Sequence, residues 1–249
     1  MNFDEAPASG GLTPRYKRVL VKLSGEALGR EGEGGIDVRE LQSMARLALS
    51  IRDLGVEVAL LVGGGNLFRG RSLSNVGVVK RTTGDSIGML ATVMNALALQ
   101  DAIEAEGGRA RTMTAIEMHR VAEPFVQRTA VRYLSEGIIT VFGGGTGNPF
   151  FTTDTAAALR AIEIGAGLLV KATKVDGVYS ADPVANPDAE RYDRLSYMEV
   201  VERRLGVMDA TAVTLCMEHR LPLVVLDAKK QGALERAVCG QEEGTLIRG

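Results

Sequence analysis

Short apolar runs rich in β-branched residues alternate with longer helical patterns along almost the whole chain. The predicted strands cover residues 18–23, 56–62, 109–115, 137–142, 167–172 and 221–227. The predicted helices cover residues 37–54, 85–106, 124–136, 154–164, 196–203, 208–219 and 232–238. The run at 56–62 is apolar almost throughout, which is typical of a strand covered on both faces. This regular alternation predicts an α/β domain with a mainly parallel sheet.

Length and charge limit the class of protein further. The chain has 249 residues, of which 45% are apolar and 24% are charged, enough for one large domain or two small lobes that share a sheet. The formal net charge of −2 argues against a protein devoted to binding a nucleic acid polymer, because such proteins usually carry a basic surplus. A small anionic ligand remains compatible with this charge.

The cysteines and the apolar runs suggest a compartment. There are two cysteines, Cys216 and Cys239, without a CxxC pair, so neither a disulfide framework nor a zinc site is expected. We also expect no membrane contact, because no apolar run is long enough to span a bilayer and no signal peptide is visible. Residues 1–15 are predicted to be a disordered lead-in, and the location is predicted to be cytoplasmic.

Four glycine-containing turns directly follow predicted strands, at residues 22–27, 63–70, 143–154 and 171–183. Ligands of open α/β sheets bind in the crevice beyond the carboxyl ends of the parallel strands, where such turns meet. The sequence therefore predicts a ligand site at this edge of the sheet.

Two cations in these turns suit a phosphate. Lys22 stands beside Ser24 and Gly25, so an ammonium group lies next to accessible backbone N–H groups. Arg69 follows three glycines and can grip a phosphate with two hydrogen bonds. Each also has a simpler explanation, as a solvated side chain on an ordinary turn.

Other polar residues have two readings as well. Thr152, Thr153 and Asp154 form a helix N-cap cluster, which either only caps or also presents its N–H groups to an anion. Asp85 is a second N-cap, the better interpretation when taken alone, or an acceptor for ribose hydroxyls. Tyr179 and the nearby Asp182, in a proline-rich loop, face an adenine and a ribose or only shape the loop.

Several familiar catalytic motifs are missing. The sequence contains no GK dipeptide, so there is no Walker A motif, and no glycine run completes GxGxxG. GxSxG and HExxH are absent as well. His119 and His219 are far apart in the sequence, and we interpret both as structural or solvated.

Five segments of the chain are informative when taken together: YKRVLVKLSGEAL, GGGNLFRG, GDSIGMLATVMNALAL, TGNPFFTTD and KATKVDGVYSADP. Together they resemble the bacterial uridylate (UMP) kinases of the amino acid kinase superfamily. The resemblance runs from about Tyr16 to Ile247, and GGGNLFRG with TGNPFFTTD is the part specific to the UMP kinase branch. It implies a single three-layer domain over 16–249, with the acceptor nucleotide mainly on 16–165 and the ATP base and ribose mainly on 166–249. It also implies transfer of the γ-phosphoryl group of ATP to UMP, giving UDP and ADP, in pyrimidine nucleotide biosynthesis.

The resemblance assigns roles to individual residues. ATP phosphates are assigned to Lys22, Leu23, Ser24, Gly25, Gly65, Arg69 and Lys171, with Lys22 stabilising the transferring group. The ATP base and ribose are assigned to Thr173, Tyr179 and Asp182. UMP is assigned to Gly64, Asp85, Thr146, Gly147, Asn148, Pro149, Phe150, Phe151, Thr152 and Thr153, with Asp85 accepting the ribose hydroxyls. Asp154 and Asp209 match acidic positions that organise the catalytic lysines, or Mg²⁺ through water.

The family uses Mg²⁺ with ATP, held largely by phosphates and water, so we expect no protein metal ligand. Its members are commonly homohexamers, often activated by GTP and inhibited by UTP. The segment associated with GTP corresponds to Arg30, Glu31, Gly32, Glu33, Gly34 and Gly35, together with Arg111. Relatives that respond to GTP have basic residues where this chain has Gln100 and Glu104. Because Glu104 would repel a triphosphate, we do not expect strong activation by GTP.

Two rival functions remain to be weighed. A kinase acting on a carboxylate or carbamate would keep the ATP half but should lack NPFFTT and GNLFRG. A non-catalytic relative that stores oxoanions or senses nucleotides should lose Lys22 or Arg69 and gain clustered histidines or acidic residues. Neither change is visible in the sequence. The sequence leaves open how strictly UMP is preferred over CMP, the oligomeric state and which acidic residue organises Mg²⁺.

Overall fold

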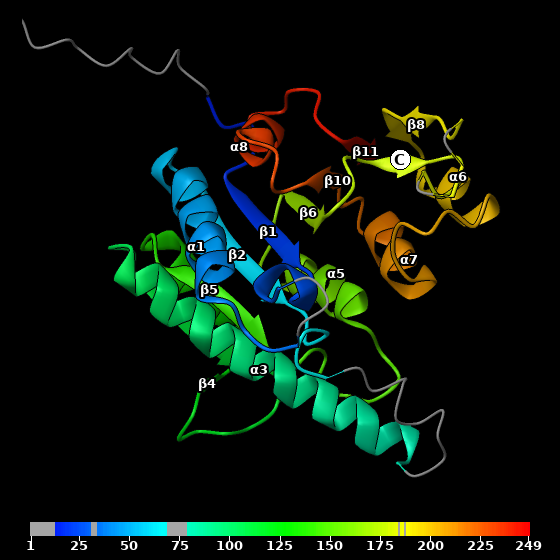
Figure 1. Cartoon of the computed structure of the whole chain (residues 1–249). Helices are drawn as coiled ribbons and strands as arrows, with labels where there is room; N and C mark the ends of the chain where they lie inside the picture. Colours follow the sequence, from blue (N-terminus) through cyan, green and yellow to red (C-terminus); the bar gives the residue numbers. More distant parts are fainter. Residues whose placement is uncertain (1–12, 31–33, 69–78, 184, 187) are drawn as a thin grey trace, which may run out of the picture.

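The computed structural model describes residues 13–30, 34–68, 79–183, 185–186 and 188–249, which form a central sheet between two layers of helices (Figure 1). The strands of the main sheet, in spatial order, are β4 (Glu123–Pro124), β3 (Ala110–Thr114), β5 (Ile139–Gly143), β2 (Glu57–Val62), β1 (Arg18–Leu23), β6 (Leu168–Thr173), β10 (Leu223–Asp227), β11 (Thr245–Ile247) and β9 (Arg194–Leu195). The helices are η1 (Gly25–Leu28, a 3₁₀ turn), α1 (Val38–Asp53), α3 (Arg81–Ala105), α4 (Gln127–Ser135), α5 (Thr153–Glu163), α6 (Tyr197–Glu202), α7 (Ala210–Glu218) and α8 (Ala233–Val238).

The main sheet is parallel from β4 to β10, and β11 pairs antiparallel with β10. Strand β1 lies in the middle, with Val21 paired to Leu60 of β2 on one side and to Val170 of β6 on the other. The glycine turns that follow β1, β2, β5 and β6 therefore leave four adjacent strands at the same edge. The predicted fold class and the predicted convergence of the turns are both confirmed.

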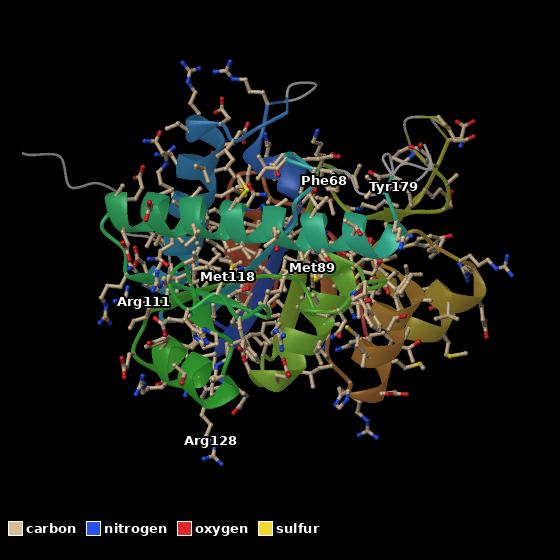
Figure 2. All side chains as sticks on the ribbon, turned by 90° about the horizontal axis from the view of Figure 1, so that it is seen from below. Phe68, Met89, Arg111, Met118, Arg128 and Tyr179 are labelled. Atoms are coloured by element: carbon tan, nitrogen blue, oxygen red, sulfur yellow. The ribbon has the colours of Figure 1, made fainter. Side chains whose placement is uncertain are left out.

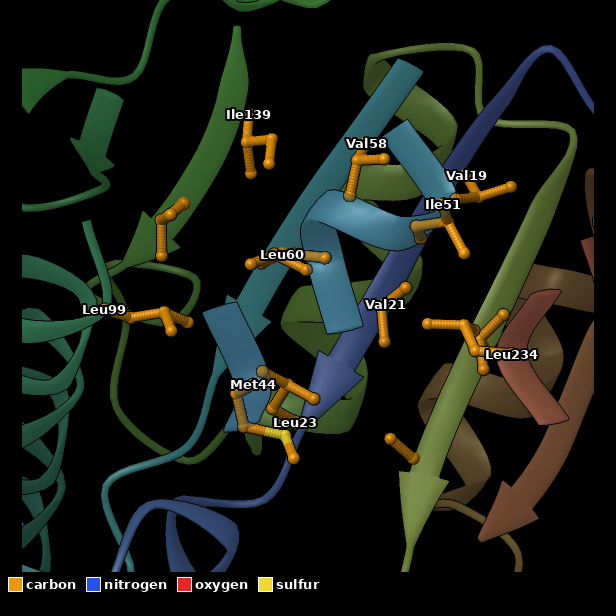
Figure 3. Packing of buried hydrophobic residues seen from close by; sticks show 14 of the residues in the cluster. Val19, Val21, Leu23, Met44, Ile51, Val58, Leu60, Leu99, Ile139 and Leu234 are labelled. Atoms are coloured by element: carbon orange, nitrogen blue, oxygen red, sulfur yellow. The ribbon is translucent and has the colours of Figure 1, made fainter. Parts of the chain in front are cut away.

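Alternate residues of the central strands enter two separate cores. Val19 and Val21 of β1 face the layer formed by α1, α3 and α8 (Figure 3). Leu20, between them, faces the layer formed by α4, α5, α6 and α7. All three side chains are 0–1% exposed, which is the burial on both faces that parallel strands require.

Side-chain caps fix where most helices begin. Asp37 accepts hydrogen bonds from the N–H groups of Arg39 and Glu40 at the start of α1. Ser196 and Glu199 form a capping box at α6. These starts agree with the sequence prediction to within a residue or two.

Helix α3 differs from its prediction in two ways. It begins at Arg81, four residues before the predicted start, with Lys80 at an N-cap that makes no side-chain hydrogen bond. It is also long and apolar enough to cross a membrane by length and composition, which the sequence analysis did not anticipate. The helix nevertheless packs against β3, β5 and α1, as a helix of a folded core does.

The longest irregular segment of the prediction contains short strands. Within it, β7 (Val178–Tyr179) and β8 (Arg191–Tyr192) form a separate two-stranded hairpin, with Tyr179 paired to Arg191. These strands, like β4 and β9, have two residues each, so they carry too little alternation to be recognised in a sequence.

Candidate active site

A group of two lysines and one aspartate lies at the carboxyl ends of the two central strands. Lys22 of β1 and Lys171 of β6 are directly opposite each other in the strand register. Their Nζ atoms lie 2.9 Å and 2.8 Å from the two carboxylate oxygens of Asp154, in the first turn of α5. Lys171 also donates a hydrogen bond to the backbone oxygen of Val207. One carboxylate thus holds two ammonium groups side by side at the edge where ligands bind.

The environment of Asp154 keeps it ionised. Its side chain is only 14% exposed, and burial by itself would raise the pKa of the carboxyl. The charges of Lys22 and Lys171 outweigh burial and hold the pKa below the ordinary value of 3.8. The oxygen that faces Lys22 accepts no well-directed hydrogen bond, so the charge of the ammonium group is its main stabilisation there.

A pocket of about 340 Å³ lies on the α3 side of this group. Its walls come from the turn after β2, the first turns of α3, the turn after β5 and the start of α5. The lining residues are Gly64, Gly65, Phe68, Arg81, Gly84, Asp85, Gly88, Met89, Thr92, Gly145, Phe151, Thr152 and Thr153.

The turn after β2 approaches α3 too closely for a side chain. A Cβ atom on Gly64 would lie 2.9 Å from the Cβ of Ala91 and 2.9 Å from the backbone oxygen of Gly88. Glycine at this position therefore lets the pocket wall pack directly against the helix. A ligand in the pocket meets backbone rather than side chains on this side.

Asp85 holds the turn after β5 and does not cap the helix. Its carboxylate accepts the backbone N–H of Phe150 at 2.8 Å and faces Nε of Arg81 at 2.8 Å and 2.9 Å. The N-cap interpretation of Asp85 is wrong because α3 already begins four residues earlier. Phe150 has φ of +74°, a conformation that non-glycine residues rarely adopt, so the hydrogen bond from its N–H supports a strained turn.

The segment 146–153 contributes unequally to the pocket. Phe151, Thr152 and Thr153 line it, and Thr152 also caps α5 by accepting from the N–H groups of Asp154 and Thr155. By contrast, Thr146, Gly147, Asn148, Pro149 and Phe150 are not among the lining residues. The ring of Phe150 is 65% exposed, so this residue contributes its backbone to the site rather than an apolar wall.

Two further pockets lie on the other side of the charged group. One, of about 370 Å³, is lined by Lys22, Leu23, Ser24, Lys171 and Thr173, with Lys174 and Lys229 adding positive charge. The other, of about 520 Å³, is lined by Lys171, Thr173, Tyr179 and Asp182, and by residues 203–207. Figure 2 shows Phe68, from the first pocket, and Tyr179, from the last, at the same end of the molecule.

The hydrogen bonds of Asp209 are made with the starts of two helices and not with the two lysines. It caps α7 by accepting from the N–H of Ala212 at 3.0 Å, and it also accepts from the hydroxyls of Thr152 and Thr155. These hydrogen bonds tie the start of α5 to the start of α7. Among the described residues, the salt bridges of Lys22 and Lys171 are made with Asp154 and not with Asp209.

The residues associated with an effector lie elsewhere. Arg30 and Gly34 line a surface pocket of about 470 Å³ with Asp37. Arg111 lies near the C-terminal end of α3 (Figure 2), 3.4 Å from Glu104 and 3.9 Å from Glu123. Arg69 and residues 31–33 lie outside the described residues.

Several pocket residues were not identified from the sequence. Thr92 is the clearest, because it is 2% exposed in the middle of α3 and accepts the N–H of Gly144 at 2.7 Å. The available signal was a polar residue within an otherwise apolar helical pattern. No sequence pattern indicated the other pocket residues, which are Phe68, Arg81, Met89 and residues 203–207. In the described part of the chain, no group of three or more acidic, His or Cys side chains is arranged to hold a metal ion.

Comparison with known proteins gives consistent relatives. A family model described as the amino acid kinase family matches residues 17–227. A curated uridylate kinase of Psychrobacter arcticus is 54% identical over 94% of this chain and 98% of its own length. One from Legionella pneumophila (strain Paris) is 55% identical over 94% of each chain. The crystal structure of UMP kinase from Bacillus anthracis has a TM-score of 0.90 and 40% identity, over 94% of this chain and 96% of that one. UMP kinase from Ureaplasma parvum has a TM-score of 0.87 and 30% identity, over 94% and 100%.

Proposed function

The chain belongs to the amino acid kinase family, and we propose from this that it is a uridylate kinase, which transfers the γ-phosphoryl group of ATP to UMP. The products are UDP and ADP, and the reaction serves pyrimidine nucleotide biosynthesis. The observation that carries the assignment is the pair Lys22 and Lys171, held by Asp154 between a pocket on the α3 side and two pockets on the other side.

Each substrate has its own pockets in this proposal. UMP would occupy the pocket of about 340 Å³, where Asp85 accepts hydroxyls of the ribose and the N–H groups at the start of α5 lie near the phosphate. The ATP base and ribose would occupy the pocket of about 520 Å³ beside Tyr179 and Asp182. The triphosphate would then run along the lysine-rich pocket toward Lys22 and the glycine turn at Gly64–Gly65.

The chemistry requires positioning and charge. A phosphate oxygen of UMP attacks the γ-phosphorus of ATP, the new P–O bond forms, and the bond from that phosphorus to the bridging oxygen of ADP breaks. The bridging oxygen leaves with the electron pair as part of ADP. Lys22 and Lys171 would neutralise the negative charge that spreads over the transferring group and the leaving oxygen. The protein supplies no covalent nucleophile in this scheme.

Mg²⁺ would enter with ATP. It would be held mainly by phosphate oxygens and water, because the carboxylate of Asp154 is already paired with two ammonium groups. Bound in this way, it would reduce the negative charge of the polyphosphate. Asp154 would act on the reaction through the two lysines, and Asp209 through the starts of α5 and α7.

Assembly and regulation are further proposals. Ile87, Leu90 and Met94 are 36%, 43% and 55% exposed at intervals of three and four residues along α3, which suits contact with a second copy in a homohexamer. GTP activation would be weak, because Arg111 already faces two carboxylates. UTP, as a uridine nucleotide, would compete for the UMP pocket, and we propose a cytoplasmic location.

A coupled assay of ADP release tests the function. The acceptors compared are UMP, CMP, dTMP, glutamate and acetylglutamate, each with Mg-ATP. We expect turnover with UMP well above the others. Absence of turnover with UMP would refute the assignment, and turnover with an amino acid alone would move the chain to another branch of the family.

A further inference from the structure

Asn95 is a fully buried amide in the middle of α3. Its side chain is 0% exposed, and most of the buried residues around it on the helix are apolar. Its Nδ2 donates to the backbone oxygen of Gly63 at 2.7 Å and to Oδ1 of Asn66 at 2.7 Å. A buried amide is costly unless its groups are paired, so these bonds explain how the helix tolerates it.

Asn66 completes the network on the other side. Its Nδ2 donates to Oδ1 of Asn95 at 3.1 Å and to the backbone oxygen of Gly35 at 2.8 Å. Its own backbone oxygen accepts the N–H of Gly35 at 2.9 Å. The two amides therefore bond to each other in both directions, and together they link the backbone of Gly35 to that of Gly63.

The orientation of the two amides is fixed by what they meet. The network ends on a carbonyl oxygen at Gly35 and on another at Gly63, so each amide must present its NH₂ group outward. Space is equally restricted, because a Cβ atom on Gly25 would lie 2.8 Å from Oδ1 of Asn66. A side chain at position 25 would therefore displace Asn66.

The glycine turn held by this pair lines the UMP pocket. Gly64 and Gly65 lie in the pocket wall, directly between Gly63, which Asn95 holds, and Asn66 itself. We propose that Asn66 and Asn95 are positioning residues for phosphoryl transfer, which fix this turn and couple it to the backbone at Gly35, outside the pocket. The proposal rests on the proposed function, because it concerns the same site.

Kinetics of single and double variants test the positioning. Asn66→Asp keeps the shape but turns a carboxylate oxygen toward the carbonyl of Gly35, and Asn66→Ala and Asn95→Ala remove one amide each. We expect kcat/KM for UMP to fall roughly 10- to 100-fold, since small misplacements near the reacting atoms have effects of this size. The KM for ATP should change less than the KM for UMP, because the pocket proposed for the ATP base and ribose is built from other segments. The double alanine variant should cost little more than the worse single variant.

A matched control separates positioning from stability. Gln127→Ala removes an amide-to-carbonyl hydrogen bond to Glu163, away from all the pockets. It should leave the kinetics unchanged. Thermal denaturation shows whether Asn66→Asp and Asn66→Ala are folded. If both variants are folded and keep the wild-type KM and kcat for UMP, the positioning role is wrong. An equal rise in the KM for UMP and in the KM for ATP would also contradict it.

Hydrogen exchange tests the coupling without turnover. We expect UMP to slow exchange of a peptide that contains Gly34 and Gly35 in the wild type but not in Asn66→Ala. UMP binding without any effect at Gly35 in the wild type would overturn the coupling. This readout remains valid if the chain binds UMP but does not phosphorylate it, so failure of the proposed function is distinguishable from failure of this inference.

Discussion

The two pockets that we propose for UMP and for the ATP base are built in different ways. The proposed UMP pocket is held in part by a buried hydrogen bond from the Gly144 N–H to Thr92. The loop of the proposed ATP base pocket is held in part by the exposed pair of Arg191 with Asp176 at 3.1 Å, and by a part-buried hydrogen bond from Tyr179 to Asp176 at 2.6 Å. Exposed pairs contribute little to stability, whereas a buried polar bond is costly to break. The difference suggests a preformed acceptor site beside a more adaptable donor site.

The largest effect should come from the lysine that lies between the two pockets. Lys22→Ala removes one of the two ammonium groups beside Asp154, and we expect kcat to fall on the order of 10²- to 10³-fold. The Michaelis constants for both nucleotides should change much less. Steady-state kinetics with each substrate varied in turn measure this, and a wild-type kcat would contradict the proposed role of Lys22.

Asp154→Ala should affect both activity and stability. It leaves Lys22 and Lys171 close together without their shared counter-charge, and breaking such a buried pair costs about 3–5 kcal/mol. In the wild type the pKa of Asp154 is lowered in the folded state, so its stabilising contribution is full above the ordinary value of 3.8. It is lost as the pH falls below that value through the folded pKa. Chemical denaturation from neutral to acid pH should therefore show a shallower loss of stability in Asp154→Ala, and parallel curves would refute the linkage.

Asp85→Ala tests the proposed UMP pocket alone. It removes the proposed ribose acceptor and the partner of the strained Phe150 N–H. Hydrogen bonds to charged groups contribute about 1.5–3 kcal/mol, so the KM for UMP should rise roughly 10- to 100-fold. The KM for ATP should hardly change. A rise in the KM for UMP without a rise in the KM for ATP is what the comparison between the pockets predicts. An unchanged UMP affinity would mean that the ribose assignment is wrong.

The smallest effect should come from a substitution in the pocket proposed for the ATP base. Tyr179→Phe removes only the part-buried hydrogen bond to Asp176 and keeps the ring, so the KM for ATP should stay within about threefold of wild type. Tyr179→Ala removes the ring face as well and should raise that KM further, with the KM for UMP unchanged. If Tyr179→Phe changed the KM for UMP more than that for ATP, the two pockets would not be independent.

The order of strands and helices and the charged residues of the site could be predicted from the sequence. The strand at 18–23 was predicted with its observed bounds because a short run of apolar and β-branched residues stands between polar segments there. Lys22, Asp154 and Lys171 were all named from the family resemblance, and the structure places the ammonium group of each lysine within 3 Å of the Asp154 carboxylate.

The rest depended on contacts between distant segments. Asp85 was interpreted as a cap because TTG precedes it, but the polar turn at 81–84 is helical and Asp85 instead meets Phe150, 65 residues later. Asn95 and Thr92 were passed over because a polar residue in a helix usually faces solvent. Only the packed structure reveals that both are buried and paired with glycine turns.

The length of α3 has a mechanical consequence. Its 25 residues extend about 37 Å, with Asp85 near one end, Asn95 in the middle, and Gln100 and Glu104 toward Arg111 at the other end. A tilt of about 3° around the middle of such a rod displaces each end by about 1 Å. Displacements of that size near reacting atoms change rates by about 10²-fold. A change in the tilt of α3 would therefore reach Asp85 and the acceptor pocket.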